Sequence, residues 1–261
     1  MSKQWKQNVT GKTVLITGAG RGIGAATARY FAESGANLLL AGKNPANIEL
    51  LTEEIISGGG RAVAVQCDVA VFDDVLRAVD RCLAEFGSLD VLINNAGIID
   101  PIATLEESNP SAWGYAADVN YKGVYHGIKA VIGPMKRQRG GVIINLSSGA
   151  ANSVLEGWSH YCSNKAASKK LTEIANKELG GYGIRVIGLS PGTVATDMMR
   201  SIKASAINPV SQLDWETHIP ADWVAKAVAF LCGDEGLLYA GTDFSIKTPE
   251  GRTLVGLPGL D

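Results

Sequence analysis

Two side chains that could act together in proton transfer, Tyr161 and Lys165, lie four residues apart. This spacing predicts that they share one face of a helix running from about Ser159 to Leu179. A phenol has a pKa of about 10, and a neighbouring ammonium lowers it by favouring the phenolate. Moving the pKa to near 7 requires roughly 4 kcal/mol, of which one ammonium supplies a part and a cationic ring a further part. The same spacing also occurs on solvated helices, so the pair alone does not define an active site.

A glycine-rich loop could cradle a phosphate. It has the sequence Thr17-Gly18-Ala19-Gly20-Arg21-Gly22-Ile23-Gly24 and lies between a predicted strand, 13–17, and a predicted helix, 23–34. Glycines let the backbone approach a pyrophosphate, and the helix start offers free N–H groups and a positive dipole end. In a first strand–loop–helix unit this indicates a dinucleotide site. The spacing is GxxxGxG instead of GxGxxG, and a turn that only packs the helix on the strand is the alternative.

The end of the second predicted strand, 37–41, bears on the choice of dinucleotide. An NAD site usually places an acid there, on the ribose 2′-hydroxyl. Here the chain continues Ala41-Gly42-Lys43 without an acid, and Arg21 adds a second cation. Two cations suit a 2′-phosphate, which favours NADP(H). NAD(H) stays possible if both are solvated surface charges.

Polar residues also follow the third and fourth predicted strands, 62–66 and 89–93. Asp68 follows the third, and Asn94-Asn95-Ala96-Gly97 follows the fourth. The carboxyl ends of parallel strands are where doubly wound sheets bind ligands. Helix capping or turn formation is an equally good interpretation of these residues.

Apolar strands alternate with helices along the whole chain. Further strands are predicted over 141–146, 184–189 and 242–246, and further helices over 47–57, 73–86, 113–135 and 221–232. Strands that are apolar on both faces indicate a parallel sheet covered on both sides. We therefore expect an α/β protein, with residues 1–261 forming a single-domain doubly wound (Rossmann) sheet of about seven strands. The irregular stretch 193–220 is a predicted lid, and 248–261 a C-terminal tail.

Composition excludes several function classes. The chain is 46% hydrophobic and 19% charged with a formal net charge of −2, which predicts a soluble globular protein without a nucleic-acid or anionic-membrane partner. The cysteines and histidines show no metal-ligand spacing, so we expect free thiols and no metal: Cys67, Cys82, Cys162, Cys232, His126, His160 and His218. A polar N-terminus and the lack of a long apolar run predict a cytoplasmic protein.

Taken together, these motifs resemble the short-chain dehydrogenase/reductase family from Gly11 to about Phe244. The resemblance rests on the loop at 17–24, the Asn-Asn-Ala-Gly at 94–97 and the Tyr-x-x-x-Lys at 161–165. Ser148 lies thirteen residues before Tyr161, Asn120 lies in the predicted helix 113–135, and Pro191-Gly192 follows the sixth strand.

The resemblance implies a catalytic set. Tyr161 would be the general acid in ketone reduction and the base in alcohol oxidation, and Lys165 would lower its pKa and bind the nicotinamide ribose. Ser148 would position the substrate oxygen, and Asn120 would hold a water that links Lys165 to solvent. Hydride would pass directly between nicotinamide C4 and the carbonyl carbon, so that the protein supplies orientation and electrostatics.

The resemblance also implies cofactor contacts and assembly. Asp68 and Val69 would meet the adenine end and Thr196 the carboxamide. The family is usually a homotetramer or homodimer, built partly from the helices 113–135 and 159–179. The full set of implied cofactor-binding residues is Gly18, Arg21, Gly22, Ile23, Gly24, Lys43, Asp68, Val69, Asn95, Ala96, Gly97, Tyr161, Lys165, Pro191, Gly192 and Thr196.

Two segments depart from the family pattern. Many members end their last strand in Val-Asp-Gly-Gly, whereas this chain has Thr242-Asp243-Phe244-Ser245-Ile246-Lys247-Thr248, which puts the C-terminal subunit contact and any substrate role of the tail in doubt. Before the tyrosine, Trp158 and His160 either line a substrate pocket, or Trp158 packs and His160 faces solvent. In the lid, the apolar side chains either line the pocket or form lid core: Met198, Met199, Ile202 and Trp215.

The leading hypothesis is an NADP(H)-dependent carbonyl reductase or alcohol dehydrogenase acting on a small molecule. The alternatives are an NAD-linked alcohol dehydrogenase, an NADP-binding regulator without catalysis, and an epimerase or dehydratase on the same scaffold. The substrate stays open among sugars, steroids, fatty acyl chains and diketones, and a preference for NADP would favour reduction.

Overall fold

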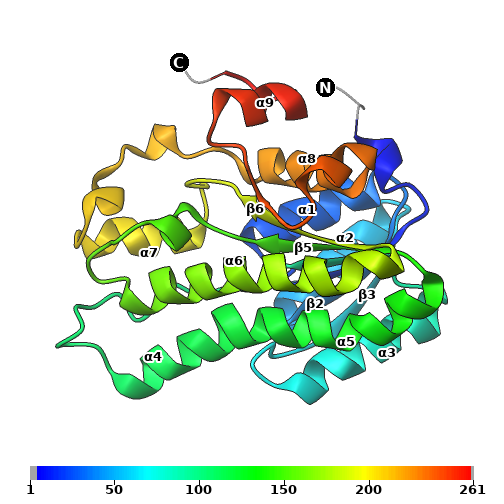
Figure 1. Ribbon diagram of the computed structural model, residues 1–261, viewed down its shortest axis with the longest axis horizontal. Helices are drawn as coiled ribbons and strands as arrows, with labels where there is room; N and C mark the ends of the chain where they lie inside the picture. Colours follow the sequence, from blue (N-terminus) through cyan, green and yellow to red (C-terminus); the bar gives the residue numbers. More distant parts are fainter. Residues whose placement is uncertain (1–4, 260–261) are drawn as a thin grey trace.

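The computed structural model describes residues 5–259 and contains a seven-stranded parallel sheet in the order β3-β2-β1-β4-β5-β6-β7. The order reverses between β1 and β4, where doubly wound sheets bind their ligands. The predicted fold class is confirmed (Figure 1). The strands are β1 Thr13–Thr17, β2 Asn37–Gly42, β3 Arg61–Gln66, β4 Val91–Asn94, β5 Gly141–Leu146, β6 Ile184–Ser190 and β7 Asp243–Ser245.

Helices cover both faces of the sheet. Figure 1 shows α1 and α8 on one side of the sheet and α5 and α6 on the other. The α-helices are α1 Gly22–Ala32, α2 Pro45–Ser57, α3 Phe72–Phe86, α4 Pro110–Ala117, α5 Gly123–Gln138, α6 Ser159–Leu179, α7 Asp197–Ser205, α8 Ala221–Cys232 and α9 Pro249–Val255. Shorter helical turns are η1 Lys6–Asn8, η2 Asp118–Lys122, η3 Gly149–Asn152, η4 Gly180–Tyr182, η5 Pro209–Gln212, η6 Trp215–Thr217 and η7 Asp234–Tyr239.

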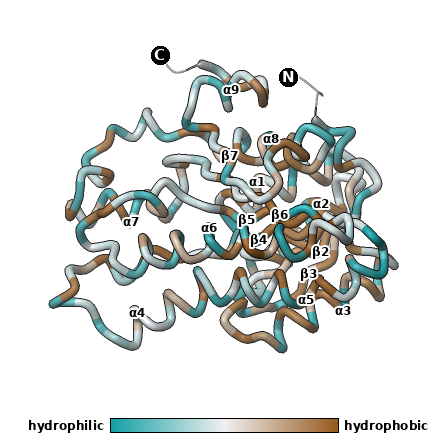
Figure 2. Tube along the Cα trace, viewed as in Figure 1, coloured by the Kyte–Doolittle hydropathy of each residue, from teal (hydrophilic) through white to brown (hydrophobic). Residues whose placement is uncertain are grey.

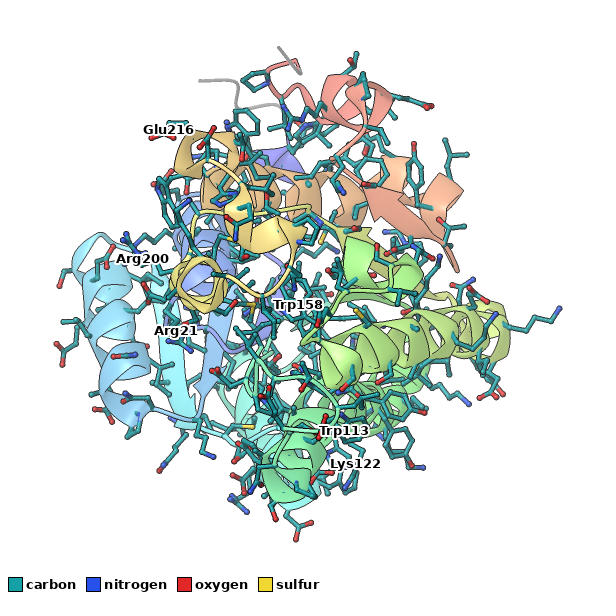
Figure 3. All side chains as sticks on the ribbon, turned by 90° about the vertical axis from the view of Figure 1, so that its left-hand side faces the viewer. Arg21, Trp113, Lys122, Trp158, Arg200 and Glu216 are labelled. Carbon is teal, nitrogen blue, oxygen red and sulfur yellow. The ribbon has the colours of Figure 1, made fainter. Side chains whose placement is uncertain are left out.

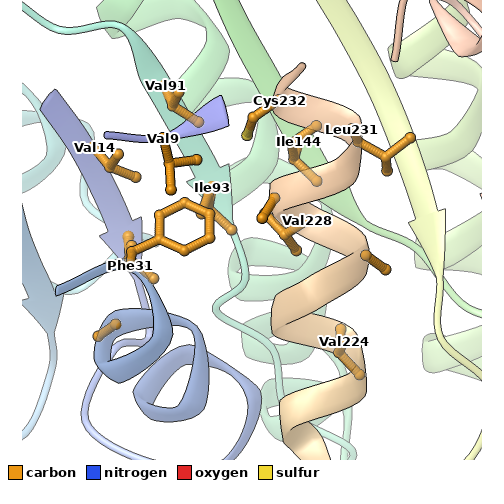
Figure 4. Packing of buried hydrophobic residues seen from close by; sticks show 14 of the residues in the cluster. Val9, Val14, Phe31, Val91, Ile93, Ile144, Val224, Val228, Leu231 and Cys232 are labelled. Atoms are coloured by element: carbon orange, nitrogen blue, oxygen red, sulfur yellow. The ribbon is translucent and has the colours of Figure 1, made fainter. Parts of the chain in front are cut away.

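Alternate residues of each strand pack into two cores. In β1, Val14 and Ile16 face the core under α1 and α8, whereas Leu15 faces the core under α3 and α5. Figure 4 shows Phe31 of α1 facing Val14 and Ile93 across the first core. Each such side chain contributes about 1.5–3 kcal/mol on full burial. Figure 2 shows the central strands mostly in the colours of hydrophobic residues, and this packing fixes the strand ends from which the site is built.

The predicted helix 113–135 differs from what the structure contains. It begins earlier, at Pro110, because the Asn109 side chain accepts a hydrogen bond from the amide of Ala112 and caps it. It is also interrupted by the π-helix η2 before α5 continues to Gln138. Such π-turns often occur at functional sites, and this one contains Asn120. The bounds of the other predicted helices and strands agree with the structure to within two residues.

The predicted lid and tail both contain ordered structure. The lid, 193–220, includes α7 and the turns η5 and η6. The tail contains α9, which is held to the N-terminal segment by a hydrogen bond of 2.8 Å from the Trp5 indole to the carbonyl of Val255; residues 260–261 of the tail lie outside the described residues. None of the helices between residues 5 and 259 is long and apolar enough to cross a membrane.

Candidate active site

A cavity of about 700 Å³ runs along the carboxyl ends of the strands. One end is formed by the glycine loop and by the residues that follow β2 and β3, and the other by the start of α6 and the lid. Figure 3 looks onto this edge of the molecule, with Trp158 near the middle of the view and Arg21 to its left. Almost all of the predicted site residues line this single cavity. They are Gly18, Arg21, Gly22, Ile23, Lys43, Asp68, Val69, Asn95, Ala96, Gly97, Ser148, Tyr161, Lys165, Pro191, Gly192 and Thr196.

The glycine loop has the backbone that its sequence requires. Gly18 and Gly22 have φ values of +63° and +53°, in the left-handed region that favours glycine. A Cβ on Gly18 would lie 2.8 Å from the Cα of Ala96. The Asn95 amide nitrogen donates to the carbonyl oxygens of Thr17 and Gly18, at 2.8 and 3.0 Å, and so ties the loop to the end of β4.

The loop and the start of α1 fit a pyrophosphate. Arg21 precedes α1 with its side chain making no cap hydrogen bond, so the first N–H groups of the helix are left for a ligand. Gly24, which was predicted to bind cofactor, does not line the cavity. A Cβ there would lie 2.4 Å from the carbonyl oxygen of Gly18, so this glycine permits close packing of the helix on the loop.

At the adenine end, Lys43 and Asp68 form an ion pair that the sequence did not predict. The Nζ of Lys43 lies 2.8 Å from Asp68 Oδ2 and donates to the Tyr115 hydroxyl at 2.6 Å, and that hydroxyl donates to Asp68 at 3.0 Å. Burial acts to raise the pKa of Asp68, but hydrogen bonds from Lys43, the Ala70 amide and Tyr115 outweigh it and hold the pKa below its ordinary value. Arg21 forms no ion pair among residues 5–259 and is exposed.

Sequence reasoning missed Tyr115, Asn44 and Asn47, all of which line this end. Tyr115 comes from α4, a distant element with no motif to mark it. Asn44 directly follows Lys43 and Asn47 lies four residues after it, and their nearness to that lysine in the sequence was the available signal.

At the other end, Ser148, Tyr161 and Lys165 come together as predicted. The Ser148 hydroxyl oxygen accepts a hydrogen bond of 3.2 Å from the Ala150 amide. Lys165 is buried, donates to the carbonyl of Leu146 at 2.6 Å, and has its Nζ 5.6 Å from the centroid of the Tyr161 ring. Three groups suited to proton transfer thus share one wall of the cavity.

Burial, and not the ammonium, dominates the titration of this pair. Burial raises the pKa of Tyr161 to about 12, against the opposing effect of a hydrogen bond with Ser148. Burial also lowers the pKa of Lys165 to about 8, with the negative charge of Asp243 acting in the opposite direction. Because both groups are taken out of water together, burial works against any lowering of the tyrosine pKa by Lys165, and that role of Lys165 stays a prediction.

Asn120 is fully buried and does not line the cavity. Its side chain is held by the backbone of Ile98: the amide oxygen accepts from the Ile98 N–H and the amide nitrogen donates to the Ile98 carbonyl, both at 2.8 Å. Its own carbonyl accepts from the Ser168 hydroxyl at 3.0 Å. The water relay implied for Asn120 stays a prediction, whereas its role in fixing the chain after β4 is evident.

Trp158 and His160 were each expected either to line the substrate pocket or to lie outside it, and the structure places them differently. Trp158 is buried, lines the cavity, and lies edge-on to Tyr161 with 5.6 Å between the ring centroids. His160 neither lines the cavity nor faces solvent. It is 1% exposed and its Nε2 lies 2.7 Å from the carbonyl oxygen of Ile99. Burial lowers its pKa, so the role that the structure gives His160 is to hold the loop after β4.

The lid contributes most of the expected apolar side chains. Met198, Met199 and Ile202 line the cavity. Trp215 does not, and instead packs against a small apolar cluster and lies edge-on to His218 with 5.3 Å between ring centroids. The lining residues of this end that sequence reasoning missed include Ser153, Leu155, Val210 and Lys247. Lys247 lies in the segment that departs from the family pattern, and this departure was the feature of the sequence that could have pointed to it.

The chain belongs to the short-chain dehydrogenase/reductase family, and it is an oxidoreductase. The sequence model of the short chain dehydrogenase family matches residues 12–206, and relatives with this class of activity match most of the chain. No group of three or more potential metal ligands is clustered within the part of the chain that the structure describes.

Two relatives and two solved structures illustrate the similarity. An uncharacterized oxidoreductase of Staphylococcus saprophyticus is 35% identical over 226 residues, which cover 85% of this chain and 90% of the relative. A 3-oxoacyl-[acyl-carrier-protein] reductase of Staphylococcus epidermidis is 35% identical over 244 residues, covering 90% and 97%. An NAD⁺-bound xylitol dehydrogenase is 29% identical with a TM-score of 0.84, covering 91% and 98%. A levodione reductase is 26% identical with a TM-score of 0.84, covering 94% and 98%.

Proposed function

We propose that this protein is an NADP(H)-dependent oxidoreductase that transfers hydride between nicotinamide C4 and a ketone or secondary alcohol, with Tyr161 as the general acid or base. The observation that carries this proposal is that Tyr161, Ser148 and Lys165 line the same cavity as the glycine loop. A dinucleotide of extended shape whose pyrophosphate lies at the start of α1 can therefore reach the tyrosine with its nicotinamide.

Ser148 and Tyr161 would act on the substrate oxygen. The Ser148 oxygen accepts from the Ala150 amide, and its hydroxyl is hydrogen-bonded to Tyr161, so a carbonyl oxygen that enters between the two hydroxyls would accept a hydrogen bond from each. The high pKa of Tyr161, about 12, keeps the phenol protonated near neutral pH. A protonated phenol can donate as the carbonyl oxygen gains negative charge, which suits general acid catalysis of reduction. When bound, the reduced nicotinamide supplies the hydride.

Lys165 would hold a proton next to this pair. Its pKa of about 8 lies close to neutral pH, so it exchanges protons there more readily than an exposed lysine. The hydrogen bond to the Leu146 carbonyl fixes its Nζ at the end of β5. We infer that Lys165 binds the nicotinamide ribose from this position and returns a proton towards Tyr161 after each turnover, with Asn120 in the relay.

The preference for NADP(H) rests on two cations at the adenine end. The charge of Lys43 is neutralised by its ion pair with Asp68, and its Nζ also donates to the Tyr115 hydroxyl, whereas Arg21 is exposed and forms no ion pair among residues 5–259. We infer that Arg21 carries the larger part of the preference for a 2′-phosphate. Asp68 and Val69 would contact the adenosine, and Thr196 the carboxamide.

Further properties belong to the same proposal. Exposed apolar side chains of η2, α5 and α6, namely Tyr121, Tyr125 and Ile174, support a homodimer or homotetramer formed through these helices. We also propose a single catalytic domain, 1–261, with its lid at 193–220, in the cytoplasm.

One class of carbonyl substrate to test is a 3-oxoacyl thioester, the kind of substrate that the Staphylococcus epidermidis relative is named for. Leu155, Trp158 and Met199 give the substrate end apolar walls that suit an acyl chain.

The test is NADPH oxidation by purified protein over a panel of ketones and 3-oxoacyl thioesters, with the products identified. Formation of a secondary alcohol with one equivalent of NADPH consumed supports the proposal. Tight NADPH binding without turnover of any compound would instead indicate a regulator. Products formed without net NADPH consumption would indicate an epimerase or dehydratase, and turnover with NADH alone an NAD-linked alcohol dehydrogenase.

A further inference from the structure

Lys247 places a positive charge at the substrate end of the cavity. It follows β7 and lines the same cavity as Ser148 and Tyr161. Its side chain passes over Gly192, where a Cβ would lie 2.7 Å from the Lys247 Cγ. Its Nζ lies 3.6 Å from where a Cβ on Gly149 would stand, and Gly149 directly follows Ser148. The ammonium therefore lies one residue away from the serine that would hold the substrate oxygen.

The charge of Lys247 is not neutralised within the part of the chain that the structure describes. Lys247 is exposed, and its Nζ forms no ion pair or hydrogen bond there. The two acids that line the cavity lie elsewhere in it: Asp68 is paired with Lys43, and Asp197 begins α7 with an oxygen 3.8 Å from Arg200.

The surroundings of Lys247 limit the chemistry of its partner. The same cavity is also lined by apolar side chains, among them Ala150, Leu155 and Trp158, so a ligand whose charge is held by Lys247 can place its carbon chain against them. A single ammonium is a point charge that matches one negative charge, and no arginine fork accompanies it at this end. This pattern suits a carboxylate better than a phosphate.

We propose that Lys247 binds a carboxylate of the substrate, so that the enzyme acts on oxo acids and the corresponding hydroxy acids. The inference rests on the proposed function. The carbonyl would lie at Ser148 and Tyr161, the carboxylate at Lys247, and the carbon chain between them against Trp158. The distance between carbonyl and carboxylate would then set which oxo acid is preferred.

The test compares oxo acids with their methyl esters, which have the same carbonyl but no charge. The pairs are 3-oxobutanoate, 4-oxopentanoate and 5-oxohexanoate with their esters, at saturating NADPH and at saturating NADH. We expect the wild type to prefer the acid in at least one pair. In Lys247→Met we expect the acid-to-ester ratio of kcat/KM to fall about tenfold, mainly through KM. A larger fall is not expected, because an ion pair that is exposed to water contributes little binding free energy beyond that factor. Lys247→Arg restores part of the ratio.

Controls separate the inference from the proposed function. Lys170→Met removes an exposed lysine of α6 that is paired with Glu173 outside the cavity, and it should leave the ratio unchanged. Equal wild-type activity on acids and esters, an unchanged ratio in Lys247→Met, or about tenfold weaker NADPH binding by that variant would each overturn the inference. Reduction of neutral ketones without any oxo acid would overturn it too, while the proposed function stands. If no carbonyl compound is reduced with either cofactor, both fail.

Discussion

The two ends of the cavity are held in different ways. The nucleotide end is built from short turns at the ends of central strands, tied together by Asn95 and by the Lys43, Asp68 and Tyr115 contacts. The substrate end is built from α6, η3 and the lid, which share a separate small apolar cluster containing Trp158, Met199 and Ile202. Substitutions at the nucleotide end should therefore disturb the sheet and the cofactor together, whereas the substrate end can change with less effect on the rest of the fold.

Gly18→Ala tests the nucleotide end and has the largest expected effect on stability and cofactor binding together. The substitution adds a Cβ at a φ of +63° and 2.8 Å from the Cα of Ala96, so backbone must shift. We expect the free energy of unfolding to fall by about 1–3 kcal/mol and NADPH affinity to fall at least tenfold, measured by thermal melting and by fluorescence titration.

Two glycines provide controls for that change. Gly180→Ala adds a Cβ with no atom within 4 Å at a φ of −56° and should change neither quantity appreciably. Gly157→Ala brings left-handed strain to the substrate end, at a φ of +75°, and should lower stability but leave NADPH affinity within about twofold. If Gly157→Ala weakened NADPH binding as much as Gly18→Ala, the two ends would not be separable.

The buried Lys165 predicts a pH dependence of stability. Its pKa falls from 10.5 to about 8 on folding, so between these values the unfolded chain binds more protons than the folded one, and stability rises with pH. We expect the difference in unfolding free energy between wild type and Lys165→Met to rise by roughly 1–3 kcal/mol from pH 8 to pH 10. Other buried groups, such as the Cys82 and Cys232 thiols, have raised pKa values and make stability fall over this pH range. Their contribution is the same in wild type and variant, so it cancels in the difference. Denaturant unfolding of both proteins checks this, and a flat difference would contradict it.

Arg21→Ala should have the smallest effect, confined to the choice of cofactor. If the guanidinium contacts a 2′-phosphate, its loss weakens NADPH binding about tenfold and leaves NADH binding nearly unchanged. Lys43→Met is the comparison, and it should have less effect on this ratio because Lys43 is already paired with Asp68. Titration with both cofactors measures it. A ratio unaffected by Arg21→Ala would show that the arginine is only a surface charge.

The sequence predicted the nucleotide end much better than the substrate end, for a physical reason. The glycine loop and the residues after each strand are local: their conformation and position follow from the strand–turn–helix pattern that contains them. At the substrate end, the walls come from segments far apart in sequence. Three features there depend on tertiary packing, which the periodicity of the sequence does not encode. They are the burial of His160 against Ile99, the position of Trp215 outside the cavity, and the path of the Lys247 side chain over Gly192.

Two further features could not be predicted from the sequence, the π-helix η2 and the effect of burial on the pKa of Tyr161. No residue pattern marks the π-helix η2, in which Asn120 lies with its side chain bonded to Ile98. The spacing of Tyr161 and Lys165 correctly placed them on one helix face, but it could not show that both are withdrawn from water. Burial is a property of the whole fold, and here it raises the pKa of Tyr161, against the lowering expected from Lys165.

The most direct test of the account is the activity and NADPH affinity of Tyr161→Phe, with Tyr182→Phe, an exposed tyrosine on η4, as control. We expect Tyr161→Phe to bind NADPH within about threefold of wild type but to lose about 10²- to 10⁴-fold in kcat, the range for a general acid. Tyr182→Phe should match wild type in both. Reduction by Tyr161→Phe at the wild-type rate would contradict the assignment of Tyr161 as the proton donor.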